Sequence, residues 1–451
     1  DNNVPYPDTF FNDSYEVYGA DWTPSIFKEF EKRRGYKLEE HLPELLLNLG
    51  ENPTQVLIDY RETLSDLLLE NFTTQWTEWA HAHGVKTRNQ AHGSPANLID
   101  HYAAVDIPEV EGFGLSDFGI KGLREDAGKT RPNYSDLSML KYASSAAHIT
   151  GKPLTSCESF TWLTEHFRTS LSQLKPDMDL IFCAGVNRMF FHGTAYSPSD
   201  DPWPGWKFYA SIDMSPTNSI WHDAASFTDY VNNCQRFLQW GQPDNDFLVY
   251  LPVRDMWAKR TSDLLMMFEI SNMDRNAPEF IRDVLQIDSL GYDCDYISDR
   301  YLMSTTYQDG KLLTAAGVAY KALIIPGEVR MTAALKAHLD SLKAQGAPIL
   351  YSIDQAAMNR LARSEELKTV CGLHMIRRSN PTGHHYFISN LTSEDVDAYV
   401  TLGVDFRDAL LFNPLNDSER FNAEMSNGKV RIRLRSGESM ILQTYDTPMP
   451  V

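Results

Sequence analysis

Short apolar segments alternate with amphipathic segments from residue 1 to about residue 245. Residues 58–83 carry apolar side chains at helical spacing. Residues 24–34 follow Thr23, a suitable N-cap, and end before Gly35, which predicts a second helix. Further helices are expected over residues 95–105 and 134–151. Strand-like segments separate these helices at intervals of roughly 30 to 50 residues, and this alternation predicts parallel βα units.

Each predicted strand of this region ends in polar residues. The segments are DSYE (13–16), RNQAHG (88–93), EVEGF (109–113), SCES (156–159) and FFHG (190–193). In a (β/α)₈ TIM-type barrel the carboxyl ends of all strands converge on one face, whereas a doubly wound sheet gathers ligand residues at one switch point. Five separate polar strand ends favour the α/β barrel. About five of the eight units are visible, so we expect the first strands to lie upstream of residue 1.

The pattern changes after this partial catalytic barrel (1–245). Residues 246–375 alternate buried strand segments such as 247–251 with helical segments such as 278–292, which predicts a Rossmann-like α/β domain. Neither a GxGxxG motif nor a P-loop occurs there, so nucleotide binding is not indicated. Residues 376–451 alternate apolar and charged positions with a period of two, which predicts a small β-sandwich.

The composition narrows the classes of partner. The 451 residues carry 41 Lys and Arg against 61 Asp and Glu, a formal net charge of −20, without long blocks of like charge. This balance argues against nucleic acid and anionic membrane surfaces. No apolar run approaches the roughly 18 residues of a membrane-spanning helix and no signal peptide opens the sequence, so membrane insertion is not expected. The five cysteines lack CxxC spacing, which indicates neither zinc nor a disulfide framework.

Three glutamates stand at or near predicted strand ends: Glu16, Glu111 and Glu158. Glycosidic cleavage needs two carboxyl groups, one kept protonated to donate to the leaving oxygen and one ionised as base or nucleophile. Three carboxylates also permit a divalent cation site, because Ca²⁺ prefers several oxygen ligands. The alternative is that each glutamate is an ion-paired barrel residue, but three at separate strand ends favour a shared catalytic site.

Other polar residues accompany these glutamates. Glu109 shares a face with Glu111 in an extended strand, so we expect it either to join Glu111 as a metal ligand or to pair with an arginine. Asp13, His92 and His192 are predicted to bind substrate, although each histidine could instead be structural. Both histidines precede a glycine, which lets the backbone turn close to a ligand.

Five aromatic residues crowd the Pro-rich segment after FFHG, and all are possible platforms for sugar rings: Tyr196, Trp203, Trp206, Phe208 and Tyr209. Tyr196 and Trp206 in this segment are expected to stack on sugar rings, unless the segment is a rigid lid packed on the barrel. No GxSxG motif occurs, so a Ser/His/Asp triad is not indicated, and flavin and nicotinamide signatures are absent too.

Five sequence blocks occur in order: DSYEVYGADWTPSIFKEFEKRRGYKLEEHLPEL, DYRETLSDLLLENF, GVKTRNQAHGSPANLIDHYAAVDIPEVEGF, NRMFFHGTAYSP and GWKFYASIDMSP. Together they resemble bacterial α-L-rhamnosidases of glycoside hydrolase family 106, and the resemblance covers roughly residues 10–255. The resemblance implies a catalytic (β/α)₈ barrel within a longer chain that carries β-domains. It implies removal of terminal α-L-rhamnose from plant polysaccharides such as rhamnogalacturonan, with inversion and with Ca²⁺ at the active site. The acidic positions of the family correspond to Glu16, Glu111 and Glu158.

Within this interpretation Glu158 is the expected general base and Glu16 or Glu111 the expected acid. Calcium would coordinate sugar hydroxyls and surplus carboxylate oxygens, with Glu109 and Glu111 as candidate ligands. We expect an oligosaccharide or polysaccharide substrate and a periplasmic, secreted or cell-surface location. Two alternatives stay open: a retaining β-galactosidase-like hydrolase, which also combines a barrel with a Rossmann-like domain, and a non-catalytic carbohydrate-binding protein.

Overall fold

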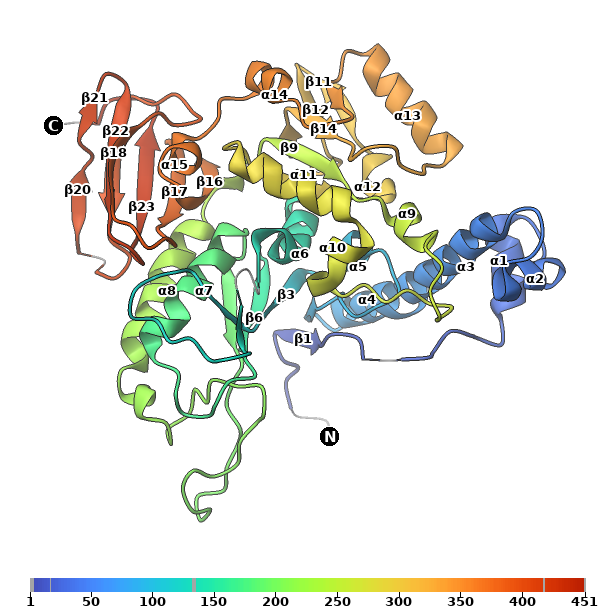
Figure 1. The fold of residues 1–451 in the computed structure, drawn as a ribbon, viewed down its shortest axis with the longest axis horizontal. Coiled ribbons are helices and arrows are strands. Elements are labelled where there is room, and N and C mark those ends of the chain that lie inside the picture. Colours follow the sequence, from blue (N-terminus) through green and yellow to red (C-terminus); the bar gives the residue numbers. More distant parts are fainter. Residues whose placement is uncertain (1–3, 17, 132–134, 417, 450–451) are drawn as a thin grey trace.

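The computed structural model describes residues 4–16, 18–131, 135–416 and 418–449. Five parallel strands form its first sheet, in the order β1-β2-β3-β6-β7 (Figure 1). They are β1 (Thr9–Asn12), β2 (Lys86–Asn89), β3 (Ile107–Phe113), β6 (Ser156–Thr161) and β7 (Arg188–Phe191). All five predicted strand segments are therefore strands. Among the described residues this sheet has five strands and not the eight of a closed barrel, so the architecture is a half-barrel sheet in a mixed α/β fold.

The helices of this region follow the predicted pattern, with shifted ends. They are α1 (Ile26–Arg34), α2 (Leu42–Leu47), α3 (Pro53–Leu68), α4 (Gln75–Ala82), α5 (Leu98–Ala103), α6 (Leu137–Ile149), α7 (Leu171–Cys183) and α8 (Ala224–Leu238). The helix expected from residue 24 begins at Ile26 and ends at Gly35, whose φ of 81° supplies the left-handed cap. The helix expected from residue 58 begins earlier, at Pro53, because proline suits the first helical position. A π-helical turn (Leu69–Thr74) joins it to α4.

A second parallel sheet has the order β10-β9-β14-β15. Its strands are β9 (Phe247–Tyr250), β10 (Cys294–Ile297), β14 (Ala322–Ile324) and β15 (Ile349–Leu350). Its helices are α9 (Val253–Trp257), α10 (Met273–Asn276), α11 (Pro278–Ser289), α12 (Asp299–Leu302), α13 (Ala333–Ala344), α14 (Gln355–Leu361) and α15 (Glu366–Thr369). A small antiparallel sheet contains β11 (Thr306–Gln308), β12 (Lys311–Leu313) and β13 (Ala319–Tyr320). This region is therefore a parallel sheet with helices between its strands, while the predicted domain boundaries stay a prediction.

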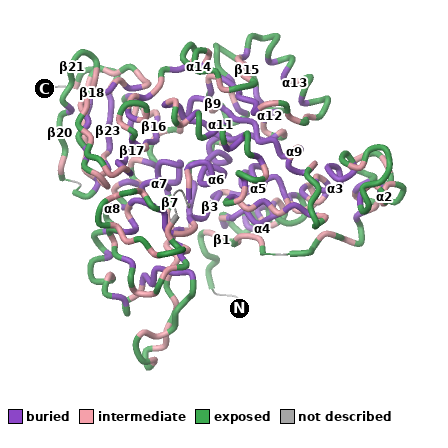
Figure 2. The backbone as a smooth tube through the Cα atoms, viewed as in Figure 1, coloured by how far each residue is buried: buried purple, intermediate pink, exposed green. Residues whose placement is uncertain are grey.

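The two parallel sheets share one apolar core, which α6 joins. Tyr142 of α6 packs edge-on against Tyr296 of β10, with ring centroids 5.0 Å apart, and both belong to one cluster of buried residues. Figure 2 shows that buried backbone is concentrated around α6, β3 and β9. The half-barrel sheet is therefore supported from one side by the second sheet.

No helix among the described residues is long and apolar enough to cross a membrane.

The third region is antiparallel and has a separate core. Its sheets have the orders β20-β19-β23-β17-β16-β8 and β18-β22-β21. The strands are β8 (Gln242–Pro243), β16 (His374–Asn380), β17 (Gly383–Ser389), β18 (Val396–Val400), β19 (Asp408–Phe412), β20 (Arg420–Asn422), β21 (Met425–Ser426), β22 (Lys429–Leu434) and β23 (Ser439–Tyr445). Val430, Ile432 and Leu434 of β22 are buried in this core, while Arg433 is exposed, as the period of two predicts.

Candidate active site

A cavity of about 300 Å³ opens at the carboxyl ends of the half-barrel strands. Its lining includes all six of the following predicted residues: Glu16, Glu111, Glu158, Asp13, His92 and His192. Glutamates that are far apart in the sequence therefore share one cavity. The chemical role of each of these residues stays a prediction.

The aromatic segment after His192 contributes other residues than expected. Tyr196 and Trp206 are exposed and do not line the cavity, whereas Phe208 and Tyr209 do. The backbone N–H of Trp206 donates to Ser197 Oγ at 2.8 Å, which connects the two arms of the outer part of the segment. The chain then returns to the sheet at Phe208, whose ring packs edge-on against His192 at 5.0 Å.

Glu158 is positioned by the register of the central strands. It lies opposite Glu111 in the β3–β6 pairing, so both side chains leave neighbouring strands on the same face. Gln90 Nε2 donates to Glu158 Oε2 at 2.6 Å, and His192 Nε2 lies 3.6 Å from the other carboxylate oxygen. Burial, reinforced by the charge of Glu111, raises the pKa of Glu158 to about 7. This carboxyl group therefore retains its proton far above the usual pH for a glutamate.

Glu111 is held by a buried hydrogen-bond chain. His92 Nε2 lies 3.1 Å from Glu111 Oε2, and His92 Nδ1 lies 2.9 Å from the hydroxyl of Tyr102. Tyr102 is fully buried, and its hydroxyl donating to Nδ1 would place the ring proton on Nε2, facing the carboxylate. Because both ring nitrogens of His92 have protein partners, this contact pattern favours positioning of Glu111 over direct binding of a sugar hydroxyl.

Glu109 was expected either to be a metal ligand or to pair with an arginine, and an arginine lies beside it. It is fully buried and accepts from Ser156 Oγ at 2.6 Å and Gln90 Nε2 at 3.1 Å, with Arg88 Nε at 3.3 Å. Its oxygens are thus already satisfied by protein donors. Within the described ranges, no group of three His, Cys, Asp or Glu side chains is arranged to hold a metal ion.

Glu269 joins the cavity although the sequence pattern did not single it out. It lies in a loop that two backbone bonds fix to the end of β2: Gly93 N–H donates to the Phe268 carbonyl at 2.9 Å, and Phe268 N–H donates to the Ser94 carbonyl at 2.8 Å. Burial raises the pKa of Glu269. The charge of His92 lowers this pKa in part, and the charges of Glu111 and Glu16 raise it further. The apolar run LLMMFE was a usable signal, because Glu269 ends it as the other acids end their strands.

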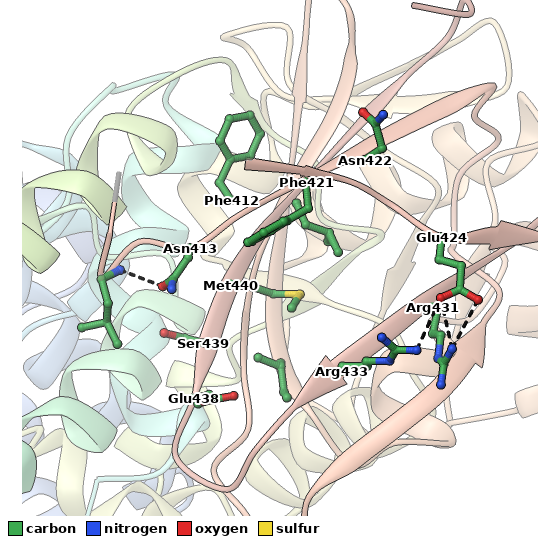
Figure 3. A pocket seen from close by; sticks show the side chains of 13 residues that line it. Phe412, Asn413, Phe421, Asn422, Glu424, Arg431, Arg433, Glu438, Ser439 and Met440 are labelled. Atoms are coloured by element: carbon green, nitrogen blue, oxygen red, sulfur yellow. Dashed lines mark hydrogen bonds and ion pairs between the residues drawn. The ribbon is translucent and has the colours of Figure 1, made fainter. Parts of the chain in front are cut away.

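A hollow of about 400 Å³ on the β-sandwich has a different character (Figure 3). Phe412, Phe421 and Met440 line it, and Arg431 pairs at its edge with Glu424 at 3.1 Å. Hydrogen bonding, first from Tyr399 and then from Arg431, lowers the pKa of Glu424, so this acid stays ionised. The half-barrel cavity, with its proton-retaining carboxyl group, is the better candidate for acid–base chemistry.

Comparison with known proteins finds similarity to proteins that are named as glycosidases. A relative from Formosa agariphila with the name "Putative beta-glucuronidase" is 28% identical over 321 residues, which are 70% of this chain and 24% of that protein. The solved structure of a rhamnosidase from Novosphingobium sp. PP1Y covers 97% of this chain with a TM-score of 0.72 at 19% identity. A beta-galactosidase from Halorubrum lacusprofundi covers 99% with a TM-score of 0.54 at 11% identity.

These likenesses differ in what they establish. At such low identities the two solved structures show a common fold, that of enzymes named as glycosidases. The chain spans only about a quarter of the curated relative and 44% of the rhamnosidase. The model of one family, described as alpha-L-rhamnosidase, matches residues 7–371, which is most of the chain. This chain belongs to glycoside hydrolase family 106.

Proposed function

We propose that this chain carries the active site of an α-L-rhamnosidase that releases terminal α-L-rhamnose by hydrolysis. The observation that carries the proposal is the carboxyl group of Glu158, whose pKa is raised to about 7 in a cavity that it shares with Glu111, Glu16 and Glu269. Glycosidic cleavage needs one carboxyl group that holds its proton and a second that acts as base or nucleophile, and this cavity brings Glu158 together with further carboxyl groups. Membership in the family supports α-L-rhamnose as the sugar that is released.

In this proposal Glu158 is the general acid and not the general base expected from the sequence. With its pKa near 7 it stays protonated at mildly acidic pH and can donate to the glycosidic oxygen. Gln90 holds one of its oxygens, which leaves the other to face the substrate. Departure of the alcohol then takes the proton of Glu158, while the C–O bond to the sugar breaks.

The proposed inverting mechanism requires a base at some distance from Glu158. Acid and base lie roughly 6.5–9.5 Å apart in inverting enzymes and about 5–5.5 Å apart in retaining ones. Glu16 and Glu269 enter the cavity from outside the sheet, so either can activate a water molecule on the far side of the sugar. A retaining mechanism is the second candidate, because Glu111 lies in register with Glu158 on the neighbouring strand.

The decisive experiment combines substrate choice with product stereochemistry. The purified protein is incubated with the p-nitrophenyl glycosides of α-L-rhamnose, β-D-glucuronic acid and β-D-galactose, and proton NMR records the first sugar released. We expect hydrolysis of the rhamnoside alone and β-L-rhamnose as the first product. Release of the α-anomer would support the retaining candidate, and cleavage of another glycoside without the rhamnoside would refute the proposed specificity.

Calcium, a plant polysaccharide substrate and a location outside the cytoplasm stay predictions of the family resemblance. Treatment with a chelator tests the ion directly. Lost rhamnoside hydrolysis that Ca²⁺ restores and Mg²⁺ does not would support it, since Ca²⁺ accepts more oxygen ligands in less regular geometry.

A further inference from the structure

A small cavity, of about 50 Å³, lies at the end of the half-barrel sheet opposite to the catalytic cavity. Thr155 and Asn187, which directly precede β6 and β7, line it, and so does Lys152 in the loop between α6 and β6. On its other side are β8 and Arg378 of β16, which belong to the antiparallel region. The cavity is therefore located where the half-barrel meets this third region.

The lining of the small cavity is basic. Lys152, Arg378 and His148 contribute to it and no acidic side chain does, although the formal net charge of the chain is −20. His148 Nδ1 lies 3.0 Å from Asp295, so this imidazole has a carboxylate partner behind the cavity. Among the described residues, neither Lys152 nor Arg378 forms an ion pair; their hydrogen bonds go to a hydroxyl and to backbone carbonyls.

Arg378 differs in this respect from its neighbour in β16. Arg377 is buried beside three carboxylates, whereas Arg378 leaves the strand on the opposite face and is only 4% exposed. Arg378 Nε and Nη2 donate to the carbonyls of Trp240 at 2.9 Å and Gly241 at 3.0 Å, and Nη1 has no partner in the described part of the chain. Burial lowers the pKa of Arg378 to about 10. Carbonyl groups satisfy its donors but leave its charge without a counter-charge.

Lys152 and Thr155 bring further unused donors to the cavity. The ammonium group of Lys152 has three N–H groups, and its partner among the described residues is Thr150 Oγ1 at 3.4 Å. Burial lowers the pKa of Lys152, and the charge of Asp106 opposes this in part. Thr155 is buried; its backbone N–H donates to Asn187, while its hydroxyl has no protein partner within the described ranges. Two cations and a hydroxyl thus line one small space that no carboxylate shares.

We propose that this cavity binds one small inorganic anion of about the size of chloride, which joins the half-barrel to the antiparallel region. Pockets for organic ligands measure roughly 300–1,000 Å³, so a sugar acid or a nucleotide is too large for this one. Water would fit, but it would not neutralise the cations, and a buried charge without a counter-charge is costly. An anion compensates Lys152 and Arg378 together. Because these two residues come from different regions, it stabilises the contact between the regions.

Thermal unfolding tests this site independently of the proposed hydrolysis. The protein is melted in sodium chloride and in sodium gluconate at equal concentration, since gluconate is too large for the cavity. General salt effects act alike on wild type and variants, so the difference in Tm between the two salts is compared among proteins. This chloride-minus-gluconate difference should be roughly 2 °C larger in wild type than in Lys152→Met, because the ion binds the folded chain only. Lys311→Met, at an exposed lysine of β12 outside the cavity, removes the same charge and should behave as wild type.

Crystals grown in sodium bromide locate the ion, because bromine scatters anomalously. We expect an anomalous peak between Lys152 and Arg378. An equal chloride response in wild type and Lys152→Met, or a cavity that holds only water, would overturn the inference, and so would stabilisation by phosphate without stabilisation by halides. A bromide peak without a chloride response in solution would mean an adventitious ion only, which also refutes the site. Arg378→Met should abolish the response as well; if that variant does not fold, Lys152→Met still decides.

Discussion

Both parallel sheets of this chain bury carboxylates, but they give them different neighbours. At the second sheet Asp246 lies 3.1 Å from Arg377 and 2.7 Å from Lys321, and Asp295 lies 3.0 Å from His148. Burial alone would raise the pKa of both aspartates, yet these cations lower it below the usual value. At the half-barrel sheet Glu158 has Glu111 as its neighbour, and burial and that charge together raise its pKa to about 7.

The difference teaches that burial of an acid does not by itself mark a catalytic site. The sign of the neighbouring charge decides whether a buried carboxyl group is locked in its ionised form or kept ready to release a proton. Asp246 and Asp295 at the second sheet are held in their ionised form by these partners. In the half-barrel cavity Glu158 and Glu269, whose pKa values are raised, are the candidates for proton transfer.

Glu158→Gln should cause the largest change in activity. If Glu158 is the general acid, kcat for ethyl α-L-rhamnoside should fall by about 10²–10⁴-fold, because the alkoxide cannot leave without a proton. p-Nitrophenyl α-L-rhamnoside should be far less affected, since p-nitrophenolate leaves unprotonated. Steady-state kinetics with the two substrates measures both effects. Equal losses on both would instead assign Glu158 to the attack step, the role of base that the sequence suggested.

Arg377→Met should cause the largest loss of stability. Arg377 is buried beside Asp244, Asp246 and Glu365, so its removal leaves carboxylates without a cation and should cost about 3–5 kcal/mol of unfolding free energy. Urea denaturation at neutral pH measures this loss, while kcat per folded molecule should not change. Arg431→Met removes a more exposed arginine with two acidic partners and serves as the control, with a much smaller loss, because solvent screens exposed ion pairs. Similar losses for both variants would contradict the comparison.

The pH dependence of kcat/KM should report Glu158 directly. A general acid works only when protonated, so activity should fall as pH rises through about 7, the pKa of Glu158. The charge of Asp13 contributes to raising that pKa, so Asp13→Asn should move the alkaline limb to lower pH by a fraction of a unit. Asp8→Asn, at an exposed residue outside the cavity, is the control and should leave the limb in place. A shift to higher pH in Asp13→Asn would contradict the assignment.

The local order of apolar and polar residues predicted the strands of the half-barrel well, but it predicted only part of the candidate site. The five polar strand ends could be read from the sequence because the period of apolar residues and the strand end are local properties, and they place Glu111 and Glu158 correctly. Glu269 was missed because its place depends on backbone bonds to Gly93 and Ser94, far away in the sequence. Tyr196 and Trp206 were expected at the cavity, but Phe208 and Tyr209 line it, because the path by which this segment returns to the sheet is not a local property of the sequence.

The smallest predicted effect concerns the thermal stability of Glu158→Gln. Because the folded-state pKa of Glu158 is raised to about 7, wild-type protein loses stability as pH rises from the usual glutamate pKa toward that value, where a buried carboxyl group must ionise. Glutamine never ionises, so the variant should match wild type at pH 4 and melt roughly 1–2 °C higher at pH 8. Glu424→Gln should show no such gain, since the pKa of Glu424 is lowered by its hydrogen bonds. A Glu158→Gln variant that melts below wild type at pH 8 would mean that the ionised carboxylate is stabilised in the cavity, and the general-acid assignment would lose its physical basis.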